Sequence, residues 1–252
     1  MQLPGRGDRG AGLTRNLLIV GHGSASVPGA GRFLAAQAER VAARGAFARV
    51  AFGFLAGAPS AAEALASLGD GPAEVAPWFM EDGWFVRTTL PAALPRDPGL
   101  RFLAPVGTHP RVADAIAARC AGFRRVLLVG HGSARAPGRR WAAHAHADAL
   151  RDRFDAVGVA FLEEPPDAAT ALAAMAGGRG ARIPLDMAEG TGEIAVVGLF
   201  LNAGVHATLD LPRAVRASGA RIRDLGPIGD DPALADIVHA RASEGGTPCT
   251  PT

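Results

Sequence analysis

The sequence predicts an α/β protein built from two similar domains, each a parallel β-sheet flanked by helices. The first observation is an internal repeat, because NLLIVGHGS at residues 16–24 returns as RVLLVGHGS at residues 125–133. The second is that LLIV and VLLV are continuous apolar runs bounded by glycine, as expected of strands buried on both faces of a parallel sheet. The third is the alternation of such runs with alanine-rich segments of helical periodicity.

The repeat has a period of about 110 residues, the size of a domain and far above that of a solenoid unit. Further stretches match in the same order: 25–29 with 134–138, 54–65 with 161–172, 79–91 with 200–212, and 105–110 with 227–232. We therefore expect an N-terminal domain at 16–121 and a C-terminal domain at 122–242. The glycine-, proline- and polar-rich tails, 1–15 and 243–252, are expected to be flexible.

Three helices are expected in each half, at corresponding places. In the first half they cover residues 35–44, 61–68 and 112–119, and in the second half 141–154, 168–176 and 233–242. The second half also contains an additional stretch, residues 177–192, that shows little hydrophobic periodicity. We interpret it as a loop.

The composition excludes several classes of protein. With 252 residues, 48% apolar content and a mean hydropathy of +0.15, the chain is typical of a globular protein. It has neither an apolar run of about 18 residues nor a signal-peptide pattern, so we expect a cytoplasmic protein without membrane partners. A net charge of +2 with scattered arginines does not favour nucleic acid, and the absence of lysine excludes a P-loop. Cys120 and Cys249 form no disulfide framework or CxxC pair.

Both GHGS segments directly follow an apolar strand, where ligands bind in open α/β sheets. The flanking glycines let the backbone turn sharply, so the imidazoles of His22 and His131 have room to project. The hydroxyl groups of Ser24 and Ser133 can hydrogen-bond backbone or ligand. A histidine that only caps a turn would explain one copy. The same tetrapeptide after the same strand twice favours a functional origin.

Two further groups follow strand ends in the second half. His206 comes after the apolar run 196–200, and neighbouring strands would bring it close to His131. Neutral ring nitrogens of these histidines could bind one divalent cation or accept protons from a ligand. Glu163 and Glu164 follow the next strand end and could supply an oxygen ligand or a general base. The alternative for these glutamates is a solvated loop.

The first half lacks most of these groups. Phe85 stands where the second half has His206, and Ala56 and Gly57 replace the two glutamates. His22 is left nearly alone. This pattern is typical of a duplicated enzyme in which one half keeps the chemistry and the other supplies a wall of the pocket.

Aromatic residues are concentrated in the first half. Trp78, Trp84 and Phe85 suggest an apolar surface suited to a flat ligand. The alternative is that they are ordinary core residues.

The ordered motifs resemble the sirohydrochlorin chelatase family, the small ATP-independent class of tetrapyrrole chelatases. They are GHGS after an apolar strand, FLE at 161–163 with a following proline, FLxxGxHxxxDxP from Phe200, and a Gly-x-x-Pro segment from Gly229. The resemblance covers nearly the whole chain, once per half. It implies two flavodoxin-like, chelatase-like α/β domains facing each other across a cleft. It also implies a lyase that inserts cobalt or iron into sirohydrochlorin in cobalamin or siroheme biosynthesis.

The resemblance also suggests a role for each site residue. In the family pattern the GHGS and GxH histidines handle the metal, which falls here on His131 and His206 as metal-binding and catalytic residues. Glu163 would be their acidic neighbour. Substrate contacts are expected from the GHGS segments, namely His22, Ser24 and Ser133, and from Arg135.

The chemistry of metal insertion agrees with these residues. The reaction needs a base for two pyrrole N–H protons, a partly desolvated metal ion and a cleft that holds the macrocycle. Arg135, with Arg139 and Arg140, could bind the carboxylate rim of sirohydrochlorin, unless these arginines belong to a solvated loop. We expect a monomer with no cofactor beyond the divalent metal substrate, cobalt or iron, with nickel or zinc also compatible.

Other enzyme classes fit less well. A histidine phosphatase expects arginine immediately before His-Gly, and glycine stands there in both copies. An α/β-hydrolase needs Gly-x-Ser-x-Gly, which neither copy supplies. A noncatalytic tetrapyrrole- or metal-binding protein of the same fold remains the alternative, because binding and turnover would use the same histidines.

Overall fold

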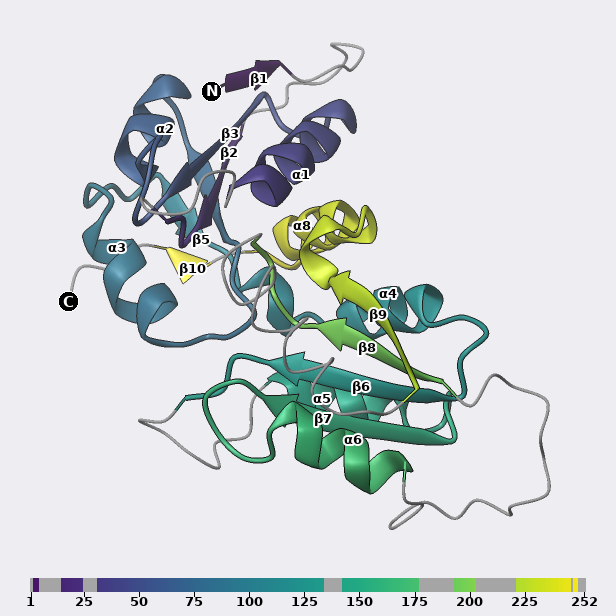
Figure 1. Cartoon of the computed structure of the whole chain (residues 1–252). Helices are drawn as coiled ribbons and strands as arrows, with labels where there is room; N and C mark the ends of the chain where they lie inside the picture. Colours follow the sequence, from purple (N-terminus) through teal and green to yellow (C-terminus); the bar gives the residue numbers. More distant parts are fainter. Residues whose placement is uncertain are drawn as a thin grey trace. The chain divides into compact units, whose positions relative to one another are not determined.

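Two parallel β-sheets organise the chain (Figure 1). The structure, a computed structural model, describes residues 2–4, 15–24, 31–133, 142–176, 193–202, 221–245 and 247–248. The chain divides into a first unit, Met1–His109 with Gly229–Thr252, and a second unit, Pro110–Ile228. The predicted α/β class, with two similar sheets flanked by helices, is confirmed.

The first sheet has a parallel core in the order β3-β2-β4-β5. Its strands are β2 (Asn16–Gly21), β3 (Arg49–Phe54), β4 (Ala73–Pro77) and β5 (Leu100–Phe102). Two short antiparallel strands extend its edges: β1 (Gln2–Pro4) pairs with β3, and β10 (Thr247–Pro248) pairs with β5. These two strands belong to the segments 1–15 and 243–252, for which flexible tails are predicted, and they pair with the open sheet edges through backbone hydrogen bonds.

The second sheet is parallel throughout, in the order β7-β6-β8-β9. Its strands are β6 (Arg125–Gly130), β7 (Ala156–Phe161), β8 (Ile194–Gly198) and β9 (Ile222–Pro227). In both sheets the first strand of the repeat lies between the second and the third. The strand order therefore reverses beside β2 and beside β6, and ligands bind at such a switch point in open α/β sheets.

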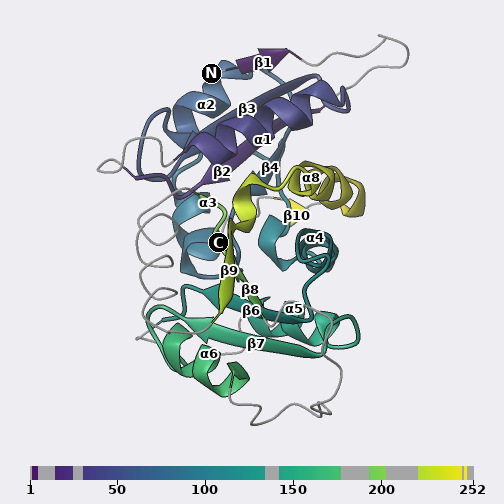
Figure 2. The ribbon, with the colours of Figure 1, turned by 45° about the vertical axis from the view of Figure 1, so that its right-hand side comes forward.

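All six predicted helices have counterparts in the structure (Figure 2). They are α1 (Arg32–Ala43), α2 (Ala61–Ser67), α4 (Arg111–Arg119), α5 (Ala142–Leu150), α6 (Ala168–Ala176) and α8 (Ala233–Glu244). Short helical turns complete the described part: η1 (Phe85–Thr89), α3 (Leu90–Ala92), η2 (Val106–Thr108) and η4 (Ile228–Asp230). The predicted loop at 177–192 lies outside the described residues.

The helical segment formed by η1 and α3 was not predicted. It contains Thr88 and Thr89, which are poor helix formers, and Pro91, which usually indicates a helix boundary. Pro91 stands directly after the transition from η1 to α3, where the helical hydrogen-bond pattern changes. Tertiary packing of Leu90, which is fully buried, stabilises the segment.

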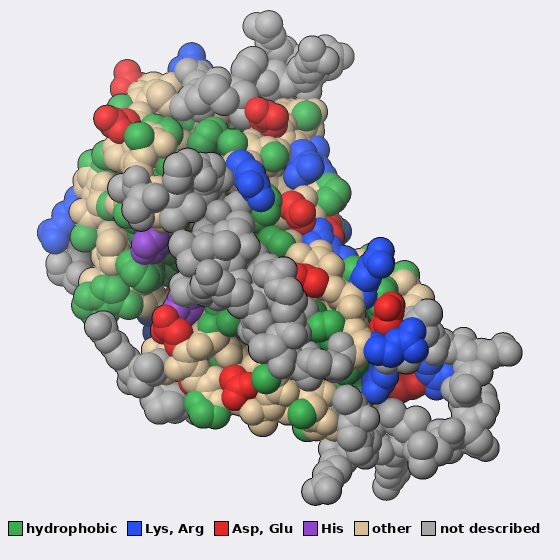
Figure 3. Space-filling model, in the orientation of Figure 1, with side chains coloured by type: hydrophobic (Ala, Val, Ile, Leu, Met, Phe, Trp, Pro, Cys, Tyr) green, Lys and Arg blue, Asp and Glu red, His purple; other side chains and the backbone are tan. Residues whose placement is uncertain are grey.

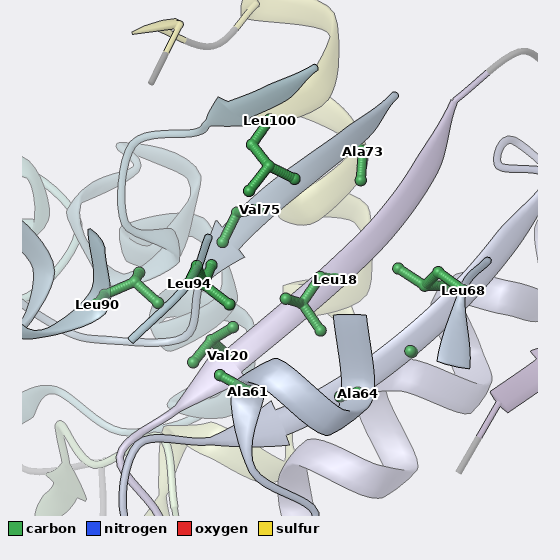
Figure 4. Close-up of a cluster of buried hydrophobic side chains, with 11 residues drawn as sticks. Leu18, Val20, Ala61, Ala64, Leu68, Ala73, Val75, Leu90, Leu94 and Leu100 are labelled. Carbon is green, nitrogen blue, oxygen red and sulfur yellow. The ribbon is translucent and has the colours of Figure 1, made fainter. Parts of the chain in front are cut away.

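The core of each unit lies between its sheet and the helices. In the first unit one face of the sheet packs against α2 and α3 (Figure 4), through Leu18, Val20, Ala51, Ala61, Ala64, Leu68, Ala73, Val75, Leu90, Leu94 and Leu100. Side chains alternate along a strand, so Leu17 and Ile19, which are also fully buried, point to the opposite face. Burial on both faces explains why the central strands consist of continuous apolar residues.

The closing helices are exchanged between the two halves. Helix α4, from the first repeat, packs against α5, and Arg153 forms an ion pair with Asp114 at 2.7 Å. Helix α8, from the second repeat, packs against α1 (Figures 1 and 2). Beside α8, the Gln37 Nε2 donates to the carbonyl oxygens of Gly229 at 3.1 Å and Asp231 at 2.7 Å.

The two structural units therefore differ from the predicted boundaries 16–121 and 122–242, which follow the sequence repeat. An amphipathic helix specifies which of its faces is buried but not which sheet covers that face. The repeat alone therefore could not reveal the exchange.

Helix α8 carries a half-buried histidine, His239, whose ring stacks on Phe47 with a centroid distance of 5.4 Å. Burial lowers the pKa of His239 from its ordinary value, and the guanidinium of Arg44 lowers it further. The carboxylate of Asp236, which Arg44 contacts at 2.7 Å, acts in the opposite direction. This packing therefore favours the neutral imidazole.

We expect His239 to make the first unit less stable in mild acid. The pKa of His239 is lower in the folded state than in the unfolded chain, where it is about 6.5. The contribution of His239 to the free energy of unfolding is therefore complete above about pH 6.5 and decreases as the pH falls through that value. Urea denaturation at pH 7.5 and 5.5 should show a larger loss of stability in the wild type than in His239→Gln, which cannot titrate. Equal losses in the two proteins would contradict this expectation.

Candidate functional site

The GHGS segments lie at the carboxyl ends of β2 and β6, as predicted. In the second unit, the Leu162 N–H donates to the Gly130 carbonyl at 3.1 Å and the Glu163 N–H to the His131 carbonyl at 3.0 Å. The backbone pairing of β6 with β7 thus continues beyond the strands. It holds the His131 loop beside the turn that carries Glu163.

The first unit repeats this backbone arrangement. The Leu55 N–H donates to the Gly21 carbonyl at 3.0 Å and the Ala56 N–H to the His22 carbonyl at 2.8 Å. The two GHGS loops therefore have the same backbone partners. What differs between the halves is the side chains placed around the histidines.

Gly132 allows the second loop to approach its neighbouring turn closely. It has φ +71°, a left-handed conformation that other residues rarely adopt. A Cβ atom there would lie 2.8 Å from the Cβ of Phe161 and 2.9 Å from the Cγ of Glu164. Position 132 therefore requires glycine, both for the left-handed backbone conformation and because a larger side chain would not fit.

The orientation of the His131 ring is set by its own loop. Its Nδ1 lies 3.1 Å from the Gly132 carbonyl oxygen. A carbonyl oxygen only accepts hydrogen bonds, so this contact assigns the ring proton to Nδ1 and leaves the lone pair on Nε2. His22 has the same arrangement, with Nδ1 2.9 Å from the Gly23 carbonyl oxygen. Each neutral ring can therefore offer Nε2 to a metal ion or to a proton.

Glu163 lies beside His131, as the sequence predicted. Its Oε2 is 3.6 Å from Nδ1 of the ring, and both side chains are 45% exposed. The distance is too long for a direct hydrogen bond, but a carboxylate this close stabilises positive charge on the ring. It stands near Nδ1, the ring nitrogen that also contacts the Gly132 carbonyl oxygen.

Glu164 has a different position, because its side chain is only 7% exposed. Its Oε1 accepts a hydrogen bond from the backbone N–H of Ser133 at 3.2 Å. The solvated-loop alternative is thus wrong for Glu164, which is buried against the GHGS loop. The contribution of Ser133 to this contact comes from its backbone.

The sequence does not predict the separate positions of the two glutamates. A signal was present, since Gly57 in the first half corresponds to Glu164. The first GHGS loop therefore lacks the carboxylate that supports the second one.

In the first unit, His22 contacts an aromatic ring instead of a carboxylate. The rings of His22 and Phe85 meet edge to face with centroids 4.5 Å apart, and Phe79 stacks on Phe85 at 6.3 Å. Trp78 is fully buried, so for this residue the core alternative is correct. Trp84 and Phe85 are exposed, as the predicted aromatic surface requires.

Several predicted site residues lie outside the described residues: His206, Arg135, Arg139 and Arg140. Within the described ranges, no three histidine, cysteine or acidic side chains are grouped so that they could hold a metal ion. Burial raises the pKa of the Cys120 thiol to about 11, so this cysteine offers no thiolate at neutral pH. The described part of the chain also contains no helix suited to crossing a membrane.

Both halves of the chain match the CbiX family model, over residues 16–122 and 125–245. The chain belongs to the CbiX family. The predicted resemblance to sirohydrochlorin chelatases is thus confirmed. A relative from Halobacterium salinarum, described as "Probable sirohydrochlorin cobaltochelatase", is 26% identical to this CbiX chain over 282 residues, with 92% of each chain covered.

Solved structures show the same fold. A CbiX described as the terminal enzyme of siroheme biosynthesis in denitrifying bacteria has a TM-score of 0.68 and 29% identity, covering 91% of this chain and 98% of its own. A multi-domain protein of Deinococcus radiodurans with structural similarity to chelatases has a TM-score of 0.74 and 25% identity. The match covers 93% of this chain but only 57% of that protein. The Bacillus subtilis chelatase SirB in complex with cobalt, at 22% identity and a TM-score of 0.68, is similar in fold.

We expect Gly132→Ala to displace the His131 loop. Left-handed strain and overpacking together should lower the free energy of unfolding by about 2–4 kcal/mol. Gly122→Ala is the matched control, because Gly122 has φ +88° but no atom within 4 Å of its Cβ position. In that control the free energy of unfolding should fall by only about 1–2 kcal/mol, because only the backbone strain is present. Urea denaturation measures both values, and equal losses would show that the close approach is unimportant.

Glu164 should support metal binding without contacting the metal. Glu164→Ala leaves the Ser133 N–H without this acceptor, and we expect Co(II) affinity to fall about 10- to 100-fold, as for other partners that orient a metal ligand. Glu164→Gln keeps an accepting oxygen and should retain most of the affinity. Calorimetric titration with Co(II) measures the three proteins. If Glu164→Ala bound Co(II) as tightly as the wild type, Glu164 would have no role in metal binding.

Proposed function

We propose that this protein is a sirohydrochlorin chelatase, a lyase that inserts cobalt or iron into sirohydrochlorin in cobalamin or siroheme biosynthesis. The observation that carries the proposal is the pairing of His131 with Glu163 at the carboxyl end of β6. Family membership and the chelatase names of the relatives support it.

His131 has two functions in this proposal. Its Nε2 lone pair binds the incoming divalent ion, or accepts a proton released from a pyrrole nitrogen. Each inserted ion displaces two pyrrole protons, so a base near the metal accelerates the reaction. Glu163 near Nδ1 stabilises the positive charge that the ring gains in either case.

His206 is proposed as the second metal-binding and catalytic histidine. It follows β8 in the sequence, and β8 pairs directly with β6, whose end carries His131. Parallel neighbouring strands deliver their carboxyl-end residues to the same edge of a sheet, which supports convergence of the two histidines.

The remaining predicted residues are proposed to bind the tetrapyrrole: His22, Ser24, Ser133 and Arg135. The metal ion is a substrate, and the proposal requires no further cofactor. We also propose that the protein acts as a monomer in the cytoplasm.

The decisive experiment measures Co(II) insertion into sirohydrochlorin from its absorbance spectrum, with and without the protein. His131→Ala and His206→Ala should each reduce the rate by about a hundredfold or more, because each removes a base and a ligand. His22→Ala, in the half without the carboxylates, should be milder.

Three results would change this assignment. Full activity in both the His131 and His206 variants would exclude their catalytic role. Equal loss in all three variants, with native circular dichroism, would show that both halves share the chemistry. Tight binding of sirohydrochlorin or Co(II) by the wild type without any insertion would indicate a noncatalytic binding protein.

A further inference from the structure

Two large aromatic side chains are exposed next to each other in the first unit. Trp84 is 71% exposed and Phe85 43%, and they are the large hydrophobic residues found exposed within the described ranges. Single exposed apolar residues are common, but a neighbouring pair is a candidate binding surface. Figure 3 shows hydrophobic side chains next to a histidine at the surface of the molecule.

The pair lies at the ligand-binding edge of the first sheet. It follows the carboxyl end of β4, which pairs with β2, the strand that carries His22 at its end. The edge-to-face contact between His22 and Phe85 joins the two strand ends directly. This is the switch point of the first sheet, the place where open α/β sheets bind their ligands.

The surface is held in place by its backbone. The segment Phe85–Thr89 is a π-helix, a rare conformation that is frequent at functional sites. The N–H groups of Val86 and Arg87 donate to the Gly83 carbonyl at 3.1 and 3.0 Å. Arg87 also forms an ion pair with Asp82 at 2.7 Å.

The same helical segment is anchored in the core beneath. Leu90 is fully buried and belongs to the hydrophobic cluster of the first unit (Figure 4). Phe79 stacks on Phe85 with an interplanar angle of 16°. The backbone that carries Trp84 and Phe85 is therefore ordered before a ligand binds, which reduces the entropy lost on binding.

The chemistry of this surface suits a flat apolar ligand and not a metal ion. Phe85 stands where the second half has His206, and Ala56 stands where it has Glu163. The first half thus has aromatic and aliphatic side chains at the places of the candidate ligands. Aromatic rings bind planar conjugated molecules through stacked or edge-to-face contacts.

We propose that Trp84, Phe85 and His22 form an aromatic platform that binds one face of the tetrapyrrole macrocycle. The proposal rests on the proposed function for the identity of the ligand. It assigns to the first half the binding of the conjugated ring, separate from the metal chemistry assigned to His131. Trp84 and Phe85 act by binding the substrate, and neither donates or accepts a proton in the reaction.

The test measures binding of metal-free sirohydrochlorin to the full chain, by titration of its absorbance and of tryptophan fluorescence. Trp84→Ala and Phe85→Ala should each raise the Kd about threefold to tenfold, the loss expected for one aromatic contact. Trp84→Phe retains an aromatic face and should restore most of the affinity. Phe123→Ala, which removes a half-buried aromatic side chain of the second unit, should leave the Kd unchanged.

The kinetics of metal insertion provide a second test of the Trp84 and Phe85 variants. The loss should appear mainly as a raised KM for sirohydrochlorin, in contrast to the loss of kcat expected for His131→Ala. Trp84 is largely outside the core, so its variants should fold normally, and circular dichroism verifies this.

The outcomes separate this proposal from the proposed function. An unchanged Kd in the Trp84→Ala/Phe85→Ala double variant, with normal insertion by the wild type, would overturn the platform alone. Binding that depends on Trp84 in a wild type that inserts no metal would support the platform and overturn the chelatase. The wild type could also form a dimer that dissociates in the double variant while the Kd for sirohydrochlorin stays unchanged. That result would assign the surface to self-association and overturn the platform.

Discussion

The geometry of the site depends on one close backbone approach, between the loop after β6 and the turn after β7. Gly132 makes this approach possible, because any Cβ atom there would collide with Phe161 and Glu164. Gly23 has the same role in the first unit: its φ is +75°, and a Cβ atom would lie 2.7 Å from the Cβ of Phe54. The histidine before each glycine is therefore held at the sheet edge with its ring directed by the loop carbonyl.

This constraint explains how the two halves can share a backbone and differ in chemistry. Hydrogen bonds from the neighbouring turn reach the same two carbonyls in each half. These bonds do not depend on side-chain identity, so the residues of the turn are free to differ. In the second half they are carboxylates, of which Glu163 faces the ring and Glu164 supports the loop. In the first half they are Ala56 and Gly57, and the histidine contacts the ring of Phe85.

Much of this arrangement could be predicted from the sequence, because its signals are local. Continuous apolar runs and glycine identified the central strands, and the repeated tetrapeptide identified the loops. Features that depend on distant parts of the chain were not predictable. The sequence could not show that Trp78 is buried while Trp84 is exposed, since both are aromatic residues near the end of β4. Nor could it show which glutamate is buried, because Glu163 and Glu164 are adjacent and identical in type.

The exchange of the closing helices has a consequence for how the chain acquires its structure. The first unit contains residues from both ends of the sequence. Helix α8, which packs on α1, follows the whole second unit in the chain. During synthesis, the first sheet leaves the ribosome long before the helix that covers it. Its contacts with α8 span most of the chain, and such distant contacts slow folding because a long loop must be closed first. A protein that arose by tandem duplication has thereby lost the independence of its halves: cutting it at the sequence repeat would leave each sheet with the helix that belongs to the other.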